Sequence, residues 1–104
     1  LELSKKGIDD LKKMAEESLK SVRNCIIALS DNDIDFAEKV IKEEERVDNL
    51  EKQIRGEHMQ RLTSGECNPR VGVIFLDALT NLERVSDHAL NVAQGVIGAN
   101  TTRN

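Results

Sequence analysis

The chain has 104 residues, of which 38% are hydrophobic, 33% are charged and only 2% are aromatic. This length fits one domain. A formal net charge of −4 and the absence of Trp and Tyr argue against a nucleic-acid-binding module, which needs a basic face and stacking aromatics. No apolar run approaches the roughly 18 residues of a membrane span, and no signal-peptide pattern is recognisable. We therefore expect no nucleic-acid partner and no direct membrane insertion of this segment.

Two features of the sequence bear on its cellular setting. The chain begins at Leu1 rather than at a methionine, so we expect a piece of a larger protein, with any membrane-spanning part outside it. Cys25 and Cys67 fall near opposite ends of the helices predicted below, roughly 35 Å apart at about 1.5 Å per helical residue. A disulfide needs Cα atoms within about 7 Å, so we expect free thiols and a reducing cytoplasmic setting.

The first predicted helix covers about residues 3–29. Its apolar residues recur at spacings that keep them on one side of an α-helix. This predicted core stripe consists of Ile8, Ala15, Leu19, Val22, Ile26 and Leu29. The run Asp31-Asn32-Asp33 then supplies residues favoured in turns and at helix N-caps.

Two further helices are predicted after this turn. The second covers about residues 34–64, and Gly65 ends it at the position where a left-handed residue is favoured. Asn68 and Pro69 open the third helix as N-cap and first helical residue, and this helix runs to about Gly98. The apolar stripe of the second helix is Phe36, Val40, Val47, Leu50, Ile54 and Leu62. That of the third is Val71, Phe75, Ala78, Leu82, Val85, Ala89, Ala93 and Val96.

The order and spacing of these helices predict the fold class. Short loops make consecutive helices antiparallel neighbours, and no strand pattern competes with the helical one. We therefore predict an all-α, antiparallel up-down-up three-helix bundle. Residues 1–99 form the single domain, and residues 100–104 form a frayed C-terminal tail.

Two acidic pairs occupy mirror positions on the second and third helices. Glu44 and Asp48 are four residues apart, as are Glu83 and Asp87, so each pair lies on one side of its helix. In an antiparallel hairpin, residues at equal height have numbers with a constant sum. Glu44 with Asp87 and Asp48 with Glu83 give the same sum, and half of it falls at the predicted turn. The helical angles also place all four carboxylates on the same side of the hairpin.

Four converging carboxylates call for a positive counter-charge. Oxygen ligands suit hard or borderline cations such as Mg, Mn, Fe or Zn. Glu51, one turn further along the second helix, and Asn91, one turn past Asp87, can supplement such a site. The sequence therefore predicts a metal site at Glu44, Asp48, Glu83 and Asp87.

Simpler explanations of the acidic pairs remain open at this point. Acidic pairs on a helix commonly form a solvated surface without any ligand. Glu83 can pair with Arg46 across the hairpin, and Asp48 can pair with Lys52 one turn away, in a surface network worth little free energy.

The other chemically notable residues give less specific signals. His58 falls near the core stripe of the second helix, where a buried imidazole with satisfied hydrogen bonds is the commoner outcome. His88 points about 100° away from Asp87, and Cys67 lies in the predicted turn. No Glu has a His three residues later, as helical di-iron sites require, and there is no phosphate-binding Gly-rich loop or nucleophile elbow. We expect no enzymatic activity.

The two acidic pairs lie within longer recognisable stretches. These are Glu44-x-x-x-Asp48-x-Leu50-x-x-x-Ile54 and Asn81-Leu82-Glu83-Arg84-Val85-Ser86-Asp87-His88-Ala89-x-Asn91-Val92-Ala93. Together they resemble the PhoU family of phosphate-transport regulators, whose signature is similar to the second stretch. In that family, acidic-x-x-x-Asp motifs bind metal clusters on a three-helix bundle. The resemblance implies the same role for the two acidic pairs of this chain.

A third stretch resembles a narrower group within this family. The segment His58-Met59-x-Arg61-Leu62-x-x-Gly65-Glu66-Cys67-x-Pro69-x-x-Gly72 is similar to the C-terminal PhoU-like domain of bacterial Na+/phosphate cotransporters. Free-standing family members usually contain two bundles in tandem, whereas this chain has one.

The resemblance implies a bacterial domain at the cytoplasmic face of the membrane that regulates phosphate transport without enzymatic activity. Its expected partners are the membrane transport domain of its parent protein, or a phosphate transporter, and a second copy of itself. Two alternatives remain: a free-standing phosphate-signalling regulator, and a structural helical interaction or oligomerisation module without metal.

Overall fold

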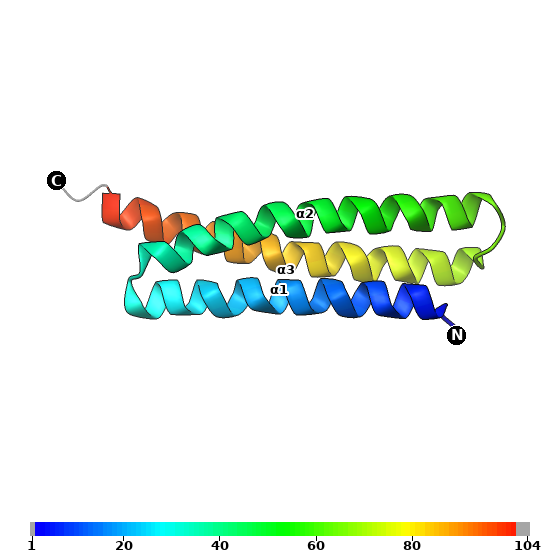
Figure 1. Ribbon diagram of the computed structural model, residues 1–104, viewed down its shortest axis with the longest axis horizontal. Coiled ribbons are helices and arrows are strands. Elements are labelled where there is room, and N and C mark those ends of the chain that lie inside the picture. Colours follow the sequence, from blue (N-terminus) through cyan, green and yellow to red (C-terminus); the bar gives the residue numbers. More distant parts are fainter. Residues whose placement is uncertain (1, 102–104) are drawn as a thin grey trace.

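Three long helices joined by two short turns make up the molecule. The computed structural model describes residues 2–101, apart from the side chain of Thr101. Helix α1 spans Lys5–Asp31, α2 spans Ile34–Thr63 and α3 spans Pro69–Thr101. Figure 1 shows α2 running antiparallel to α1 and α3. The three helices form a rod that measures 59 × 18 × 16 Å. The predicted all-α, up-down-up three-helix bundle is confirmed.

Local hydrogen bonds define the helix ends close to where the sequence predicts them. Ser4 is the N-cap of α1, and its Oγ accepts a hydrogen bond from the Gly7 main-chain N–H at 3.0 Å. Asp33 at the start of α2 and Asn68 at the start of α3 accept N–H groups of the first helical turn in the same way. Gly65 has a φ of +79°, the left-handed conformation predicted for the residue that ends the second helix. No helix in the described part of the chain has both the length and the apolar character of a membrane span.

The end of α3 differs from the prediction. The sequence predicts that this helix ends near Gly98 and that a frayed tail starts at residue 100, whereas α3 continues through Thr101. The side chains of Asn100 and Asn32 exchange two hydrogen bonds of 2.9 and 2.7 Å, and Asn32 is the left-handed C-cap of α1. The helix thus ends later than the sequence predicts, and this cross-helix pair holds Asn100 against the end of α1. Residues 102–104 lie outside the described residues.

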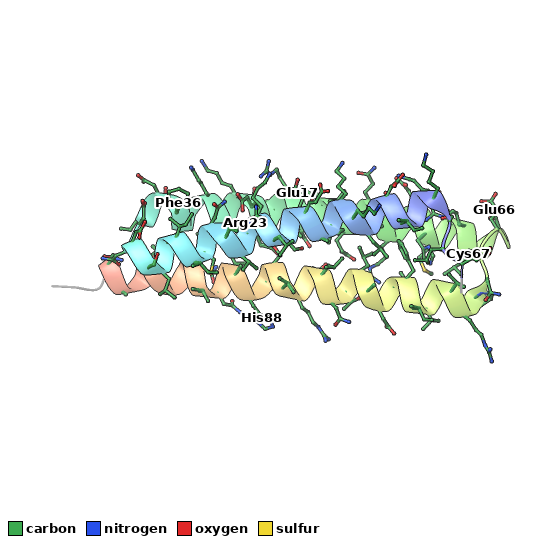
Figure 2. All side chains as sticks on the ribbon, turned by 90° about the horizontal axis from the view of Figure 1, so that it is seen from below. Glu17, Arg23, Phe36, Glu66, Cys67 and His88 are labelled. Carbon is green, nitrogen blue, oxygen red and sulfur yellow. The ribbon has the colours of Figure 1, made fainter. Side chains whose placement is uncertain are left out.

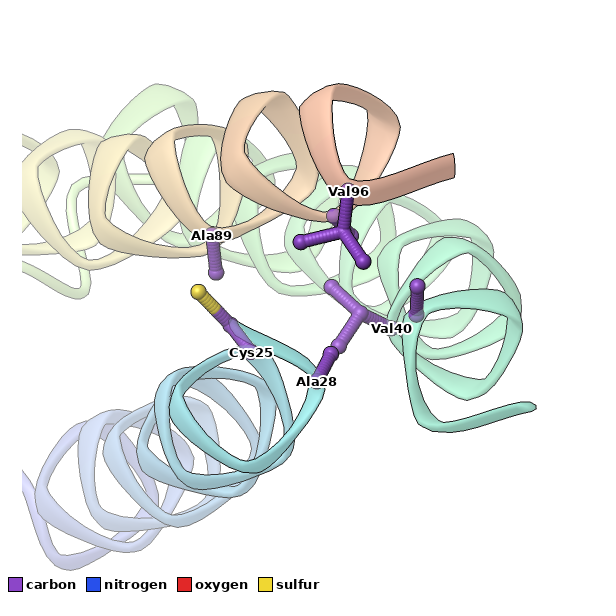
Figure 3. Packing of buried hydrophobic residues seen from close by; sticks show 7 residues of the cluster. Cys25, Ala28, Val40, Ala89 and Val96 are labelled. Carbon is purple, nitrogen blue, oxygen red and sulfur yellow. The ribbon is translucent and has the colours of Figure 1, made fainter. Parts of the chain in front are cut away.

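The core consists of two apolar clusters separated by a polar layer. The cluster nearer the α2–α3 turn contains Met14, Val47, Ile54, Phe75 and Leu79. The cluster in Figure 3 contains Cys25, Ala28, Ala37, Val40, Ala89, Ala93 and Val96. Between them lie the buried residues Ser18, Ser21, Glu43 and Ser86. Glu43 accepts hydrogen bonds from Ser21 Oγ at 3.3 Å and Asn24 Nδ2 at 2.6 Å, so its buried carboxylate is satisfied.

The predicted core stripe of the first helix is largely wrong. Ile8, Leu19, Ile26 and Leu29 are 39%, 53%, 57% and 63% exposed. The side of α1 that faces the bundle instead carries Gly7, Asp10, Met14, Ser18, Ser21, Cys25 and Ala28. The reason is that small side chains fit where three helices approach closely, so the most apolar side of α1 is not its packed side.

The exposed side of α1 continues onto α3. A groove between the two helices is lined by Val22, Cys25, Val85, His88, Ala89 and Val92. Val85 and Val92 are themselves 39% and 38% exposed. We refer to the surface formed by Leu19, Val22, Ile26, Leu29, Val85 and Val92 as the α1/α3 apolar face.

Candidate metal centre

Five carboxylates lie along the seam between α2 and α3. The turn at residues 64–68 folds α3 back along α2, so the two acidic pairs reach the same level. Glu44 lies within hydrogen-bonding reach of Asp87, and Glu83 lies within hydrogen-bonding reach of Glu51. One oxygen each from Asp48, Glu51 and Glu83 lie within 4.8 Å of one another. We call Glu44, Asp48, Glu51, Glu83 and Asp87 the acidic cluster.

The four carboxylates that the sequence groups share this seam, but only Asp48 and Glu83 of the four belong to the set of oxygens within 4.8 Å of one another. Asp48 is close enough to influence the charge of both Glu44 and Glu83, and so is Asp87. Glu51, predicted only as a supplement, is 5% exposed and belongs to the cluster itself. Asn91 is exposed on α3 one turn beyond Asp87, and its part in the site remains a prediction.

The crowding of negative charge changes the protonation of two members of the cluster. Burial raises the pKa of Glu44 from 4.5 to about 8, and hydrogen bonding to Asp87 and the charges of nearby acids add to this effect. Burial likewise raises the pKa of Glu83 to about 7, with contributions from Glu51, Asp87 and Asp48. Protonated Glu44 can donate a hydrogen bond to Asp87, and protonated Glu83 can donate one to Glu51. In the absence of a bound cation, these protons reduce the repulsion between the carboxylates of the cluster.

Protein cations compensate only part of the cluster. Lys52 lies 3.1 Å from Asp48, so this predicted alternative pair exists, but its side chain is 69% exposed. Arg55 Nε donates a hydrogen bond to Glu51 Oε1, and Arg55 Nη2 donates one to Thr80 Oγ1 at 3.0 Å.

The remaining members of the cluster have no such partner. Among residues 2–100, no ion pair within 4.0 Å joins a basic side chain to Glu44, Glu83 or Asp87. The other predicted partner, Arg46, is exposed and lines a groove together with Lys13 and Glu17 of α1. The basic side chains of the described residues therefore leave these three carboxylates without an ion-pair partner.

One buried oxygen of the cluster has no hydrogen-bond partner in the part of the chain that the structure describes. Glu44 Oε2 is buried and accepts no hydrogen bond from the described residues. A buried carboxylate oxygen in this position costs free energy unless a cation or a proton satisfies it. All potential metal ligands in the cluster are carboxylate oxygens, the ligand type preferred by Mg²⁺, Mn²⁺ and ferrous or ferric iron and accepted by Zn²⁺. The residues present therefore fit a metal ion.

The histidines and Cys67 lie elsewhere. His58 is 3% exposed and stacks on Phe75 with ring centroids 4.2 Å apart, and burial lowers its pKa. Figure 2 shows His88 projecting away from the bundle. His88 also lines the rim of the groove between α1 and α3. Cys67 lies in the α2–α3 turn and lines, with His58, a cavity of about 100 Å³ at that end of the rod. Cys25 and Cys67 are both free, as predicted.

The sequence analysis missed Arg55 and Thr80. The spacing of four residues between Glu51 and Arg55 is a readable signal for an ion pair along a helix. The contact between Arg55 and Thr80 has no such signal, because it depends on how α3 is rotated against α2.

Comparison with known proteins identifies relatives of the chain. A family model described as "PhoU domain" matches residues 11–96. The protein "Phosphate-specific transport system accessory protein PhoU homolog 1" of Thermotoga maritima is 31% identical over 97 residues, which cover 93% of this chain and 42% of that protein. PhoU homologues of Clostridium acetobutylicum and Xylella fastidiosa are 28% and 29% identical, each over 84% of this chain.

The matches cover only 42%, 42% and 37% of the three relatives, so the chain spans about two fifths of their length. No solved structure gives a significant match to the chain.

Proposed function

The chain belongs to the PhoU family, and we propose that it is a non-enzymatic regulatory domain of phosphate transport that binds metal through its acidic cluster. The observation that carries the metal part is the pairing of Glu44 with Asp87 and of Glu83 with Glu51 across the seam, where basic side chains compensate only Asp48 and Glu51. The names of the relatives, which describe accessory proteins of phosphate-specific transport, support the regulatory part.

In this proposal Glu44, Asp48, Glu83 and Asp87 hold the ion, with Glu51 as a further ligand and Asn91 at the edge of the site. A bound cation supplies positive charge that no side chain of the cluster can supply. Because the ligands come from α2 and α3, occupancy increases the free energy of unfolding by linking the two helices. The uncompensated charge of the cluster and the unpartnered Glu44 Oε2 support this role.

We further propose that the chain is the cytoplasmic domain of a bacterial Na+/phosphate cotransporter, acting on the membrane transport domain of its parent protein. The segment from His58 to Gly72, which resembles such domains, supports this assignment. A free-standing phosphate-signalling regulator fits the relatives equally well. The coding sequence next to this segment distinguishes them: several hydrophobic spans directly before Leu1 support the cotransporter, and a second copy of the acidic motifs supports the free regulator.

The α1/α3 apolar face favours an additional role in self-association. Leu19, Val22, Ile26 and Leu29 follow one another at intervals of three, four and three residues, the spacing of a helix–helix seam. An isologous contact between two copies would cover this face on both. We propose a second copy of the chain as its partner, with or without metal at the cluster.

Melting curves with and without metal test the proposed metal site. We expect Mn²⁺, ferrous iron, Zn²⁺ or Mg²⁺ to raise the melting temperature of the chain above its value in chelator. The double variant Glu83→Gln with Asp87→Asn should lose this increase. A control of equal charge change, Glu38→Gln with Glu45→Gln, alters exposed positions on α2 and should retain it. Melting curves that are the same in chelator and with each of the four metals would contradict metal binding.

A further inference from the structure

Arg55 connects the acidic cluster to the opposite helix. It lies on α2, where its Nε donates to Glu51 Oε1, one turn away. Its Nη2 donates to Thr80 Oγ1 on α3 at 3.0 Å. The Glu51 side chain is 7% exposed, whereas the Arg55 side chain is 38% exposed. One guanidinium therefore joins a buried ligand of the cluster to the facing helix.

Lys52 provides an internal comparison. It pairs with Asp48 at 3.1 Å, also one turn away on α2, but the two side chains are 69% and 43% exposed. Exposed pairs of this kind contribute little to stability. Arg55 and Lys52 thus bring the same charge to the same cluster, but Arg55 also donates a hydrogen bond to α3.

We propose that Arg55 is the internal counter-ion of the acidic cluster: it clamps Glu51 to Thr80 when no metal is bound, and an incoming cation must share Glu51 with it. The first half of this proposal stands without metal binding, and the second half rests on the proposed function. Both halves concern a positioning role, because Arg55 acts through Glu51 and supplies no ligand atom.

The physical argument follows from burial and fixed charge. A buried carboxylate without a partner is strongly unfavourable. Without Arg55, Glu51 would lose the positive charge that offsets its repulsion by the nearby Asp48 and Glu83. An arginine guanidinium carries a fixed positive charge, so the side chain of Arg55 repels a metal ion that approaches Glu51. Arg55 therefore stabilises the ion-free hairpin and raises the metal concentration needed to fill the site. Metal binding then changes the charge of the cluster but does not have to bring its carboxylates together first.

The matched variants Arg55→Gln and Lys52→Gln test the proposal, because each removes one positive charge from the same helix. We expect Arg55→Gln to lower the melting temperature in chelator by about 4–8 °C, and Lys52→Gln to lower it by less than about 2 °C. Calorimetric titration with Mn²⁺ should show severalfold tighter binding to Arg55→Gln than to the unchanged chain. Thr80→Val keeps the charge and loses only the cross-helix bond, so its melting temperature should fall partway while its Mn²⁺ affinity stays close to that of the unchanged chain.

Each outcome has a definite meaning. Equal melting temperatures for Arg55→Gln and Lys52→Gln overturn the clamp. Mn²⁺ binding to Arg55→Gln that is unchanged or weaker overturns the competition for Glu51, since a merely structural residue would give that result. Failure of the unchanged chain to bind Mn²⁺ overturns the competition as well, while the melting temperatures in chelator still decide the clamp. Should Arg55→Gln not fold, Thr80→Val decides the clamp alone, and an unaltered melting temperature overturns it.

Discussion

Glu44 of α2 and Asp87 of α3 lie within hydrogen-bonding reach of each other, with carboxyl groups from two different helices in contact. Such a contact is unfavourable between two ionised groups. Burial raises the pKa of Glu44 to about 8, so Glu44 keeps its proton at neutral pH. The pair therefore shares a proton, which the metal ion proposed above would have to displace. The same holds for Glu83 and Glu51 further along the seam, where the pKa of Glu83 is raised to about 7.

Neutralising Glu44 should stabilise the chain when metal is absent. Glu44→Gln removes a charge from the cluster, and its amide can donate a hydrogen bond to Asp87. At pH 8.5 in chelator we expect the free energy of unfolding to rise by about 0.5–1 kcal/mol, and at pH 6, where Glu44 is already protonated, by much less. Thermal or urea unfolding at the two pH values measures this. Glu45→Gln, at the exposed neighbouring position, is the control and should show no such pH difference.

The ion-free chain should lose stability as the pH rises from about 5 to 8.5. Glu44 and Glu83 keep protons in the folded state up to about pH 8 and 7, whereas the unfolded chain releases them near 4.5. The folded state therefore binds more protons in this window, and raising the pH favours unfolding. Melting temperatures in chelator across this range measure the decline, and Glu44→Gln with Glu83→Gln should flatten it. Stability that increases between pH 6 and 8.5 would contradict the pKa shifts.

Metal affinity should change in the opposite direction over the same window. Binding displaces the protons that Glu44 and Glu83 retain, so affinity for Mn²⁺ should increase from pH 6 to 8.5. Calorimetric titration in buffers of different ionisation enthalpy measures the number of protons released. A pH-independent affinity would show that Glu44 and Glu83 are not ligands.

The placement of the acidic cluster was predictable because it needs only two facts about the sequence. The helical repeat puts Glu83 and Asp87 on one side of α3, and the turn at Gly65 fixes which residues of α2 they face. Neither fact depends on the detailed packing of side chains. The clamp of Arg55 on Thr80 does depend on that packing, so only its Glu51 half has a signal in the sequence.

The orientation of α1 was not predictable from its apolar pattern. The pattern shows which side of the helix is most apolar, and that side carries the exposed Leu19 and Ile26. The packed side carries Ser18 and Ser21, which fit the close approach of three helices at mid-length. Sequence periodicity cannot distinguish a face buried within the bundle from one that is available to a partner.

Two glycines should respond oppositely to alanine. At Gly56, inside α2, an added Cβ meets no atom within 4 Å, so Gly56→Ala should raise the free energy of unfolding by about 0.5–1 kcal/mol. At Gly65 the φ of +79° is unfavourable for any L side chain, so Gly65→Ala should lower it by about 1–2 kcal/mol. Chemical denaturation of the two variants beside the unchanged chain measures both shifts. A loss of stability in Gly56→Ala would indicate a contact at this position that the fold does not show.

Charges placed on the α1/α3 apolar face should prevent self-association without unfolding the bundle. Leu19 and Ile26 are 53% and 57% exposed, so Leu19→Glu with Ile26→Glu removes little buried area from the monomer. Light scattering coupled to size-exclusion chromatography should show a dimer for the unchanged chain and a monomer for this variant.

The control for this experiment is Met59→Glu with Val73→Glu. These residues are 47% and 60% exposed and lie outside the α1/α3 apolar face, so this variant should remain a dimer. Dissociation by both double variants alike would indicate a general effect of added negative charge on a chain that already carries a net charge of −4. A monomeric unchanged chain at high micromolar concentration would instead contradict the second copy as partner. The apolar stripe of α1 would then be left for a different helix, which the membrane transport domain of a parent protein could supply.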